Sequence, residues 1–306
     1  MRIMRKISKY IAMAAVATAL TACQEELNPE SIFIDVVEPT STEESYTYDF
    51  DQWLYEHYTK PYNVEFLYKL DDNATDPNYN LVPTRLGMSD TLAHLALYLW
   101  FDVYDKIVDE NFLKENGPRM IQLIGSAAIN AAQGTEKLGT AEGGIKVTLY
   151  KINLMETNNL DQLNEYVFKT MHHEFSHILH QKKKYPREFE TLTPGDYDTD
   201  GWQYRSDKEA WQLGFASPYG SSEAREDFVE IIANYIVKTD ADWQKMLTVA
   251  GQDGANGASI INQKLEICRA WLAEKWEIDI DALHKEVQAR QENLNYEKIM
   301  KCDFSY

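Results

Sequence analysis

The sequence predicts an α+β fold, with a small antiparallel or mixed sheet early in the chain and helices through most of the remainder. Short runs rich in β-branched and aromatic residues lie before residue 153, and apolar stripes at helical spacing follow residue 158. With 306 residues and 44% hydrophobic content, the chain is long enough for one large domain or two small ones.

The charge of the chain narrows the classes of partner. It has 49 acidic and 30 basic residues, which gives a formal net charge of −19. So acidic a surface repels the phosphates of nucleic acids and the headgroups of anionic lipids, and we therefore expect no nucleic-acid partner. Its three cysteines are too few for a disulfide framework.

Residues 1–22 have the pattern of a bacterial secretory signal rather than of a folded segment. Four basic residues precede an apolar run over 11–20 that is too short to span a bilayer. The run ends in Leu20-Thr21-Ala22-Cys23, which resembles the lipobox of bacterial lipoproteins and implies that Cys23 becomes a lipidated N-terminus. A plain signal peptide followed by a chance cysteine is the alternative.

We interpret residues 23–45 as an acidic tether. Its Gln24-Glu25-Glu26 resembles the acidic export tag of lipoproteins displayed on Bacteroidetes-type bacteria, which implies a lipid-anchored place on the outer membrane, facing the cell surface. The periplasmic face is the alternative. The folded domain is expected over 46–306, with a helical C-terminal part over about 240–306. Cys268 and Cys302 either form a disulfide or stay buried as small apolar residues.

The elements of the folded domain are expected in a definite order. Residue patterns predict a helix over 51–59, a strand over 63–70, a helix over 89–108, and strands over 120–124 and 145–152. Between the last two strands, a loop is indicated by Gly134, Gly139, Gly143 and Gly144. The strand Ile145–Ile152 is the expected sheet edge, where an extended peptide could pair. Two helices over about 160–182 and 222–237 follow.

The helix over 160–182 contains the clearest chemical motif. Its start is predicted at Asn159, a capping residue, with Gln162 completing a capping box. Further along, His173-Glu174-Phe175-Ser176-His177 fits the pattern H-E-x-x-H. An apolar stripe along the helix is formed by Leu163, Val167, Met171, Phe175 and Ile178.

Both motif histidines point away from that stripe by roughly 150°, and therefore toward a cleft. Two imidazoles one turn apart can bind one zinc ion at about 2.0–2.1 Å. Glu174 projects to one side, where it can reach a metal-bound water without becoming a ligand. Histidines that are satisfied by ordinary hydrogen bonds are the alternative.

A catalytic zinc site needs a third protein ligand. On the helix over 222–237, Glu226 and Glu230 lie one turn apart, opposite an apolar stripe. The pair resembles zincins in which a helical glutamate is the third ligand and an acidic residue four positions later hydrogen-bonds a ligand histidine. This resemblance implies Glu226 as the ligand and Glu230 as that partner. Glu223 and Asp227 are the alternates, and a solvated acidic face is the simplest alternative.

Two other signals for metal binding are weaker. His180 lies on the helical face of the motif histidines, but three ligands along one rod fit a tetrahedron poorly, so we expect it to line the cleft or support a ligand. The first half of a calcium-binding EF-hand loop is matched by Asp196, Asp198 and Asp200, which would be the Ca²⁺ ligands. Position twelve is Asp207 rather than glutamate, and an Asp/Gly-rich turn is the alternative.

Several segments together resemble the zinc metallopeptidase lipoproteins of Bacteroidetes. They are the H-E-x-x-H motif followed by Gln181, then Gly214-Phe215-Ala216-Ser217-Pro218-Tyr219, then Glu226-Asp227-Phe228-Val229-Glu230, with Lys60-Pro61-Tyr62-Asn63-Val64 upstream. The resemblance covers about 46–237 and implies a zincin-like fold. Because these proteins are associated with outer-membrane nutrient import, it also implies a TonB-dependent importer as a partner. The spacing of Tyr219 from the two glutamates also resembles lethal-factor-type gluzincins, which implies that its hydroxyl donates to the developing oxyanion.

These features predict zinc-dependent hydrolysis of peptide bonds in a peptide or protein substrate. Zinc held by His173, His177 and Glu226 would lower the pKa of bound water toward about 7 and polarise the scissile carbonyl. Glu174 would take the proton of the water and pass it to the leaving amine. One alternative is a substrate-binding lipoprotein of an importer with a structural or vestigial zinc site, against which the intact Glu174 argues. Another is hydrolysis of a non-peptide amide or ester.

Overall fold

The computed structural model describes residues 41–306, except 71–74, 76–77, 131–134, 138, 143 and 305–306. The predicted signal segment, Cys23 and the tether up to residue 40 lie outside the described residues. The elements up to the middle of the chain are α2 (Tyr48–Leu54), η1 (Tyr55–Thr59), α3 (Lys60–Tyr62), β1 (Glu65–Leu67), α4 (Leu86–Ala96), η3 (Leu97–Phe101), α5 (Asp102–Ile107), α6 (Phe112–Asn116), β2 (Met120–Leu123), β3 (Ala128–Asn130), β4 (Thr135–Lys137), β5 (Gly139–Glu142), β6 (Lys146–Leu149) and η4 (Ile152–Leu154).

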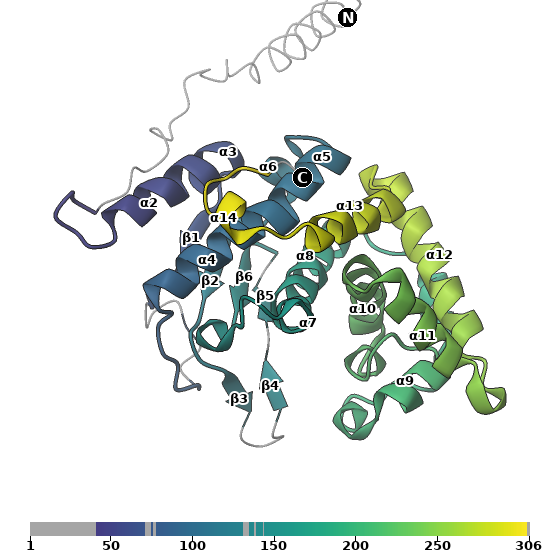
Figure 1. The fold of residues 1–306 in the computed structure, drawn as a ribbon. Coiled ribbons are helices and arrows are strands. Elements are labelled where there is room, and N and C mark those ends of the chain that lie inside the picture. The colour runs from purple at the N-terminus through teal and green to yellow at the C-terminus, as the bar shows by residue number, and fades with distance from the viewer. Residues whose placement is uncertain are drawn as a thin grey trace, which may run out of the picture. The chain divides into compact units, whose positions relative to one another are not determined.

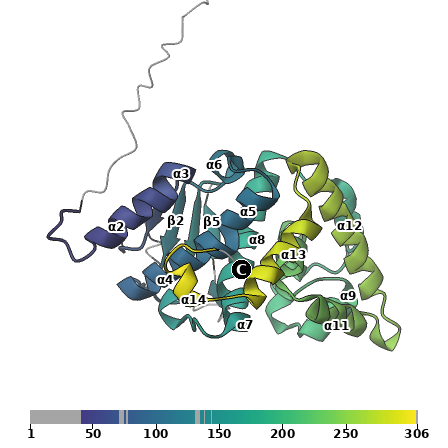
Figure 2. The same cartoon turned by 45° about the horizontal axis from the view of Figure 1, so that its top comes forward.

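The second half of the chain is helical, as predicted. Its elements are α7 (Leu160–Leu163), η5 (Asn164–Phe168), α8 (Lys169–Lys182), η6 (Arg187–Thr191), η7 (Trp202–Tyr204), α9 (Asp207–Leu213), η8 (Tyr219–Ser221), α10 (Ala224–Val237), α11 (Asp240–Ala250), η9 (Gln252–Gly254), α12 (Gly257–Trp276), α13 (Ile280–Glu292) and α14 (Tyr296–Ile299). Within the folded residues, Figures 1 and 2 show the strands and helices α2 to α6 on one side and helices α9 to α12 on the other, with α8 between them.

The sheet is small and mixed, which confirms the predicted α+β class. Four strands lie in the order β1-β2-β6-β5, and a separate pair is formed by β3 and β4. Strands β1, β2 and β6 run parallel, whereas β5 runs antiparallel to β6. The last three residues of both β2 and β6 are buried, because neighbours cover both faces of these central strands.

The predicted edge strand was wrong. Residues 146–149 form β6, which pairs with β2 on one side and β5 on the other and is therefore interior. The two edges of the sheet are β1 and β5, and β5 begins at Gly139 within the stretch that its glycines predicted to be a loop. Four glycines within eleven positions predicted a loop. The strand forms there because it pairs with β6, and such a contact cannot be predicted from local sequence.

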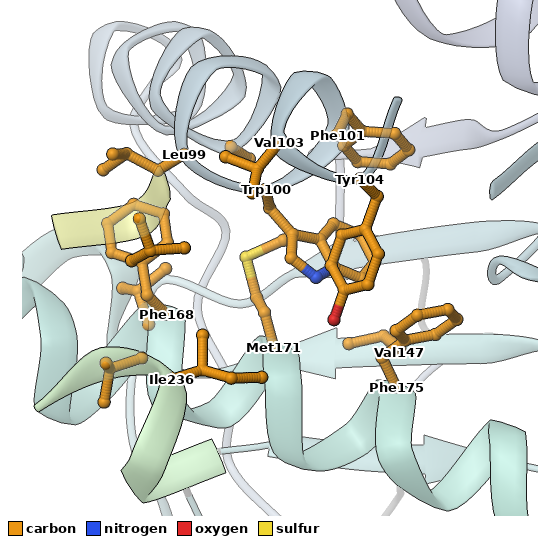
Figure 3. Packing of buried hydrophobic residues seen from close by; sticks show 14 of the residues in the cluster. Leu99, Trp100, Phe101, Val103, Tyr104, Val147, Phe168, Met171, Phe175 and Ile236 are labelled. Atoms are coloured by element: carbon orange, nitrogen blue, oxygen red, sulfur yellow. The ribbon is translucent and has the colours of Figure 1, made fainter. Parts of the chain in front are cut away.

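Helix α8 is positioned by aromatic packing against the segment from α4 to α5. The Phe175 ring lies 5.5 Å from Trp100 and 5.3 Å from Tyr104, both edge-on. Figure 3 shows these rings beside Met171 of α8 and Val147 of the sheet. The apolar stripe predicted for α8 therefore faces the core, which leaves the opposite face of the helix for the motif histidines.

The start of the helix over 160–182 differs in detail from the prediction. Asn159 caps it as expected, since its Oδ1 accepts the N–H of Gln162 at 3.1 Å. The Gln162 side chain, however, accepts from the N–H of Glu156, so the predicted capping box is incomplete. Residues 164–168 form a π-helical turn between α7 and α8, a type of distortion that often lies near functional sites.

The helices after the sheet pack in a chain of contacts. Helix α10 packs against α8, and α12 and α13 pack against α10. Cys268 is buried and Cys302 partly exposed, and both are free thiols rather than a disulfide. Among the described helices, none combines the length and apolar character needed to cross a membrane.

Candidate metal centre

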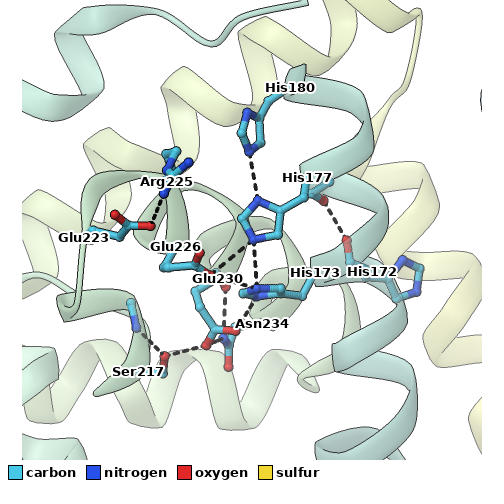
Figure 4. Close-up of polar contacts among 12 residues, drawn as sticks. His172, His173, His177, His180, Ser217, Glu223, Arg225, Glu226, Glu230 and Asn234 are labelled. Carbon is cyan, nitrogen blue, oxygen red and sulfur yellow. Dashed lines mark hydrogen bonds and ion pairs between the residues drawn. The ribbon is translucent and has the colours of Figure 1, made fainter. Parts of the chain in front are cut away.

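The candidate site lies where α8 and α10 face each other. His173 and His177 extend from consecutive turns of α8, and Glu226 and Glu230 extend toward them from α10 (Figure 4). Each helix buries an apolar face against the core, so its opposite face is left to the polar residues. The two pairs meet although they are about fifty residues apart in the chain.

Three side-chain atoms form a nearly equilateral triangle. Nε2 of His173 lies 3.1 Å from Nε2 of His177 and 3.1 Å from Oε2 of Glu226. The third side, from Nε2 of His177 to the same carboxylate oxygen, is 3.2 Å. Tetrahedral zinc bonds of about 2.0–2.1 Å place neighbouring ligand atoms about 3.3–3.4 Å apart. The triangle therefore fits zinc after a small expansion, and no other such group exists in the described part of the chain.

The donor chemistry of the triangle also fits a cation. Nδ1 of His173 lies 2.8 Å from Oε1 of Glu230, and because a carboxylate can only accept, this nitrogen carries a hydrogen. In the neutral ring Nε2 then has a lone pair, which points at the acceptor Oε2 of Glu226. Two acceptors facing each other need a positive charge between them, and a metal ion or a proton can supply it.

The electrostatics of the centre are consistent with this requirement. Burial by itself lowers the pKa of His173, but the hydrogen bonds to Glu226 and Glu230 outweigh it and raise the pKa to about 10. Burial likewise opposes ionisation of Glu226, yet its contacts with both histidines hold the pKa of that carboxyl below its usual range. The Glu226 carboxyl is therefore ionised at neutral pH.

Glu230 is fixed by a dense set of contacts. Its carboxylate is only 3% exposed. It accepts from the hydroxyl of Ser217 and from Nδ2 of Asn234, the latter at 3.0 Å. Burial raises its pKa, but the charge of Lys169 and the hydrogen bond from His173 outweigh this and lower the pKa to about 2. Glu230 thus lies in the predicted position, orienting the ring of His173.

His180 contacts a motif histidine and lies outside the triangle. Its Nε2 is 2.9 Å from Nδ1 of His177, so the two rings share one hydrogen. Burial, helped by the neighbouring His177, lowers the pKa of His180 to about 4. The neutral ring therefore orients His177 in the way that Glu230 orients His173.

Glu174 and Tyr219 lie beside the triangle, in a pocket of about 300 Å³. Burial raises the pKa of the Glu174 carboxyl, an effect that His173 and His177 oppose. Tyr219 is 38% exposed as a residue, and its ring lies 5.8 Å from the ring of His173. Burial, and then the charge of Glu226, raise the pKa of its phenol, so the hydroxyl keeps its hydrogen.

The alternate ligands lie elsewhere. Glu223 pairs with Arg225 at 2.6 Å, and Asp227 is buried against Lys264, also at 2.6 Å. For calcium, Asp196, Asp198 and Asp200 do not bring three ligand atoms together in the described structure. Oδ1 of Asp198 instead accepts the N–H of Gly201 at 2.8 Å, as in a turn, and calcium binding there stays an untested prediction.

Some residues of the site could not be found from the sequence alone. The pocket is lined by Gly139 and Thr140 of β5. Gln181 of α8 and Arg225 of α10 line it as well. Nothing local in the sequence links β5 to α8, since their contact depends on the whole sheet. Asn234, in contrast, lies one helical turn after Glu230, and this spacing could have predicted their hydrogen bond.

Comparison with known proteins gives two matches. A family model described as "Putative zinc-binding metallo-peptidase" matches residues 43–281. The crystal structure of a "putative zinc-binding metallo-peptidase" from Bacteroides caccae is 38% identical to this chain, with a TM-score of 0.71. The alignment covers 87% of this chain and 98% of that one. None of the curated proteins matches the chain.

Proposed function

The chain belongs to the family described as "Putative zinc-binding metallo-peptidase", and on that premise we propose that it is a zinc-dependent peptidase of the gluzincin type. One observation carries the proposal: Nε2 of His173, Nε2 of His177 and Oε2 of Glu226 lie within 3.2 Å of one another, and the carboxylate of Glu174 lines the same pocket without belonging to this triangle. A structural zinc site has no need of that fourth, basic group.

The residues around the triangle are suited to peptide hydrolysis. Zinc bound there would supply a Lewis acid that acidifies water and polarises a carbonyl. The Glu174 carboxylate would accept the proton of the attacking water and return it to the leaving amine, and burial makes this carboxylate a stronger base. The Tyr219 hydroxyl would donate to the oxyanion, an interaction of a kind worth about 3–4 kcal/mol where measured.

The sheet edge offers a place for an extended substrate. Strand β5, which ends the sheet, contributes Gly139 and Thr140 to the wall of the pocket. Main-chain pairing with an edge strand is a general mode of peptide recognition. We therefore propose that an extended substrate pairs with the main chain of β5. Strand β5 thus takes the docking role that the sequence had predicted for the strand over 145–152.

The Glu174→Gln variant tests the mechanism. It removes the base and preserves shape, so we expect bound zinc at the parent level and loss of most hydrolysis of denatured casein. Circular dichroism and zinc content control for folding and metal loading. Turnover like that of the parent would refute the assigned role, and a zinc-loaded parent that cleaves nothing in a broad peptide panel would refute the peptidase proposal.

We also propose that Cys23 anchors the protein to the outer membrane, where a TonB-dependent importer would be its partner. The pattern of residues 1–23 and the acidic residues that follow support this. We expect the parent in the membrane fraction and Cys23→Ser in the soluble fraction, with protease accessibility on intact cells reporting the exposed face. A Cys23→Ser variant that stays in the membrane would contradict the anchor.

A further inference from the structure

Arg225 provides a fixed positive charge at one end of the pocket. It is the second residue of α10, directly before Glu226, and its side chain lines the pocket. Figure 4 shows it across from His180 and beside Glu226. Among the described lining residues Arg225 is the only arginine or lysine, and its guanidinium stays cationic at every physiological pH.

Tyr219 lines the same pocket on the side of His173. The Tyr219 ring lies 5.8 Å from the ring of His173, and Trp202 stands edge-on to Tyr219 at 5.0 Å. Arg225 instead interacts with Glu226 and Tyr185, and with His180 beside them. A substrate in the pocket can therefore contact the aromatic ring of Tyr219 near His173 and the guanidinium of Arg225 near His180.

The hydrogen bond to Glu223 occupies only part of the Arg225 guanidinium, so other N–H groups can bind a substrate. Within the described residues its one hydrogen bond runs from Nη2 to Oε1 of Glu223, at 2.6 Å. A guanidinium has five N–H donors, and its fork geometry fits a carboxylate in a bidentate manner. The two side chains are 63% and 41% exposed, and exposed ion pairs of this kind contribute little because water screens them. A substrate carboxylate can therefore share or replace Glu223.

We infer that Arg225 is a specificity-determining residue that selects substrates with a carboxylate close to the scissile bond, either an acidic side chain or the C-terminal carboxylate. The inference rests on the proposed peptidase function and adds a substrate class to it. Hydrogen bonds to charged groups contribute about 1.5–3 kcal/mol, so we expect at least a roughly tenfold preference over the matched neutral peptide.

Pairs of fluorogenic peptides test this on the zinc-loaded full chain. One set differs only by Glu or Gln at each of several positions on both sides of the bond, and a second set by a C-terminal acid or amide. A preference confined to the first set identifies an acidic side chain, and one confined to the second identifies the C-terminus. A ratio of kcat/KM near one in both sets would overturn the inference.

Variants separate the role of Arg225 from general effects on the site. We expect Arg225→Gln to bring the ratio near one, mainly by raising KM for the acidic peptide, and Arg225→Lys to restore part of it. Glu223→Gln removes the competing carboxylate, so the ratio should rise. A preference that survives Arg225→Gln would overturn the inference.

Failure of the peptidase proposal can be distinguished from failure of this one. If the parent cleaves no peptide, the same pairs are measured as Kd by fluorescence anisotropy. A tenfold tighter Kd for the acidic member that is lost in Arg225→Gln supports the inference without any turnover. Equal Kd values for the members of every pair overturn it.

Discussion

Both ring nitrogens of His173 lie against carboxylate oxygens, Nδ1 at 2.8 Å from Glu230 and Nε2 at 3.1 Å from Glu226. Two ionised carboxylates around one neutral imidazole leave a local excess of negative charge. A proton or a divalent cation can balance it, and the two compete for Nε2. Metal loading at this residue is therefore linked to pH.

We predict that zinc affinity rises with pH, because zinc must displace the proton of His173. Hydrogen bonds to Glu226 and Glu230, against the opposing effect of burial, raise the pKa of His173 to about 10. The ring is therefore protonated at neutral pH without metal, and the association constant should rise about tenfold per pH unit from about pH 7 to 9 before levelling off. Competition with a chelator of known affinity at each pH measures the slope.

The matched control for this prediction is Glu230→Gln. The amide removes one of the two charges that hold the proton on His173, so the slope should become shallower, while zinc binding at high pH weakens about 10–100-fold. An association constant that does not change over the same pH range in the parent would contradict the prediction.

At the residue scale, the sequence predicted the site residues that lie one helical turn apart on the same helix. His173 and His177 are one helical turn apart, as are Glu226 and Glu230, and periodicity placed each pair on a polar face. Ser217 precedes Glu230 by thirteen positions and reaches it through a turn before α10. No periodic pattern encodes such a contact.

At the scale of elements, the approach of β5 to α8 shapes the wall of the pocket. A Cβ built on Gly139 would lie 2.3 Å from Cγ2 of Thr170 and 3.3 Å from Oε1 of Glu174. A Cβ at this position would therefore force the Thr170 side chain, the strand or the helix to shift. The sequence pattern marked Gly139 as loop because it is one of four closely spaced glycines, and this spacing carries no information about which element each glycine touches.

We predict that Gly139→Ala destabilises the protein and lowers peptidase activity together. The added methyl strikes the Thr170 methyl group and strains the packing of β5 on α8, and overpacking of this kind costs about 1–3 kcal/mol. A shift of β5 that relieves this strain also moves the strand relative to Glu174. Urea unfolding measures the change in the free energy of unfolding, and casein hydrolysis measures the activity.

A second substitution tests the cause. Thr170→Ser removes the methyl group that the new Cβ would strike, so the double variant should recover part of the lost stability. If Gly139→Ala is as stable as the parent, or if Thr170→Ser makes no difference to it, the close contact between strand and helix is not the constraint.

For the whole molecule, one buried ion pair joins the metal-site helix to the C-terminal helices. Nζ of Lys264 on α12 lies 2.6 Å from Oδ2 of Asp227 on α10, and neither side chain is exposed. The ammonium also donates to Oγ1 of Thr193 and to the carbonyl of Gly214, each at 2.9 Å. Asp227 directly follows Glu226, so this network holds the start of α10 in place.

We predict that Lys264→Met destabilises the fold by about 3–5 kcal/mol, because it leaves a buried charge without a partner. The double variant Lys264→Met/Asp227→Asn removes that charge and should recover most of the loss. Chemical denaturation of the parent, both single variants and the double variant gives the coupling energy. Equal stability of the Lys264→Met single variant and the double variant would contradict this account.

The role of the C-terminal helices could not be predicted. Residues 240–294 carry no recognisable motif, and their helical pattern says nothing about which surface they cover. In the structure α12 and α13 pack against α10. Which helices pack together depends on the shapes of whole buried faces, whereas periodicity reports only that each helix has one.

Zinc content tests the central claim most directly. Plasma mass spectrometry on the parent should find about one zinc per chain, and Glu226→Ala, which removes one vertex of the triangle, should retain much less. Glu223→Ala, one turn away in the sequence and outside the triangle, is the matched control and should keep its zinc. A parent that binds no zinc after reconstitution, or a Glu226→Ala variant that keeps it, would contradict the assignment of His173, His177 and Glu226 as the metal site.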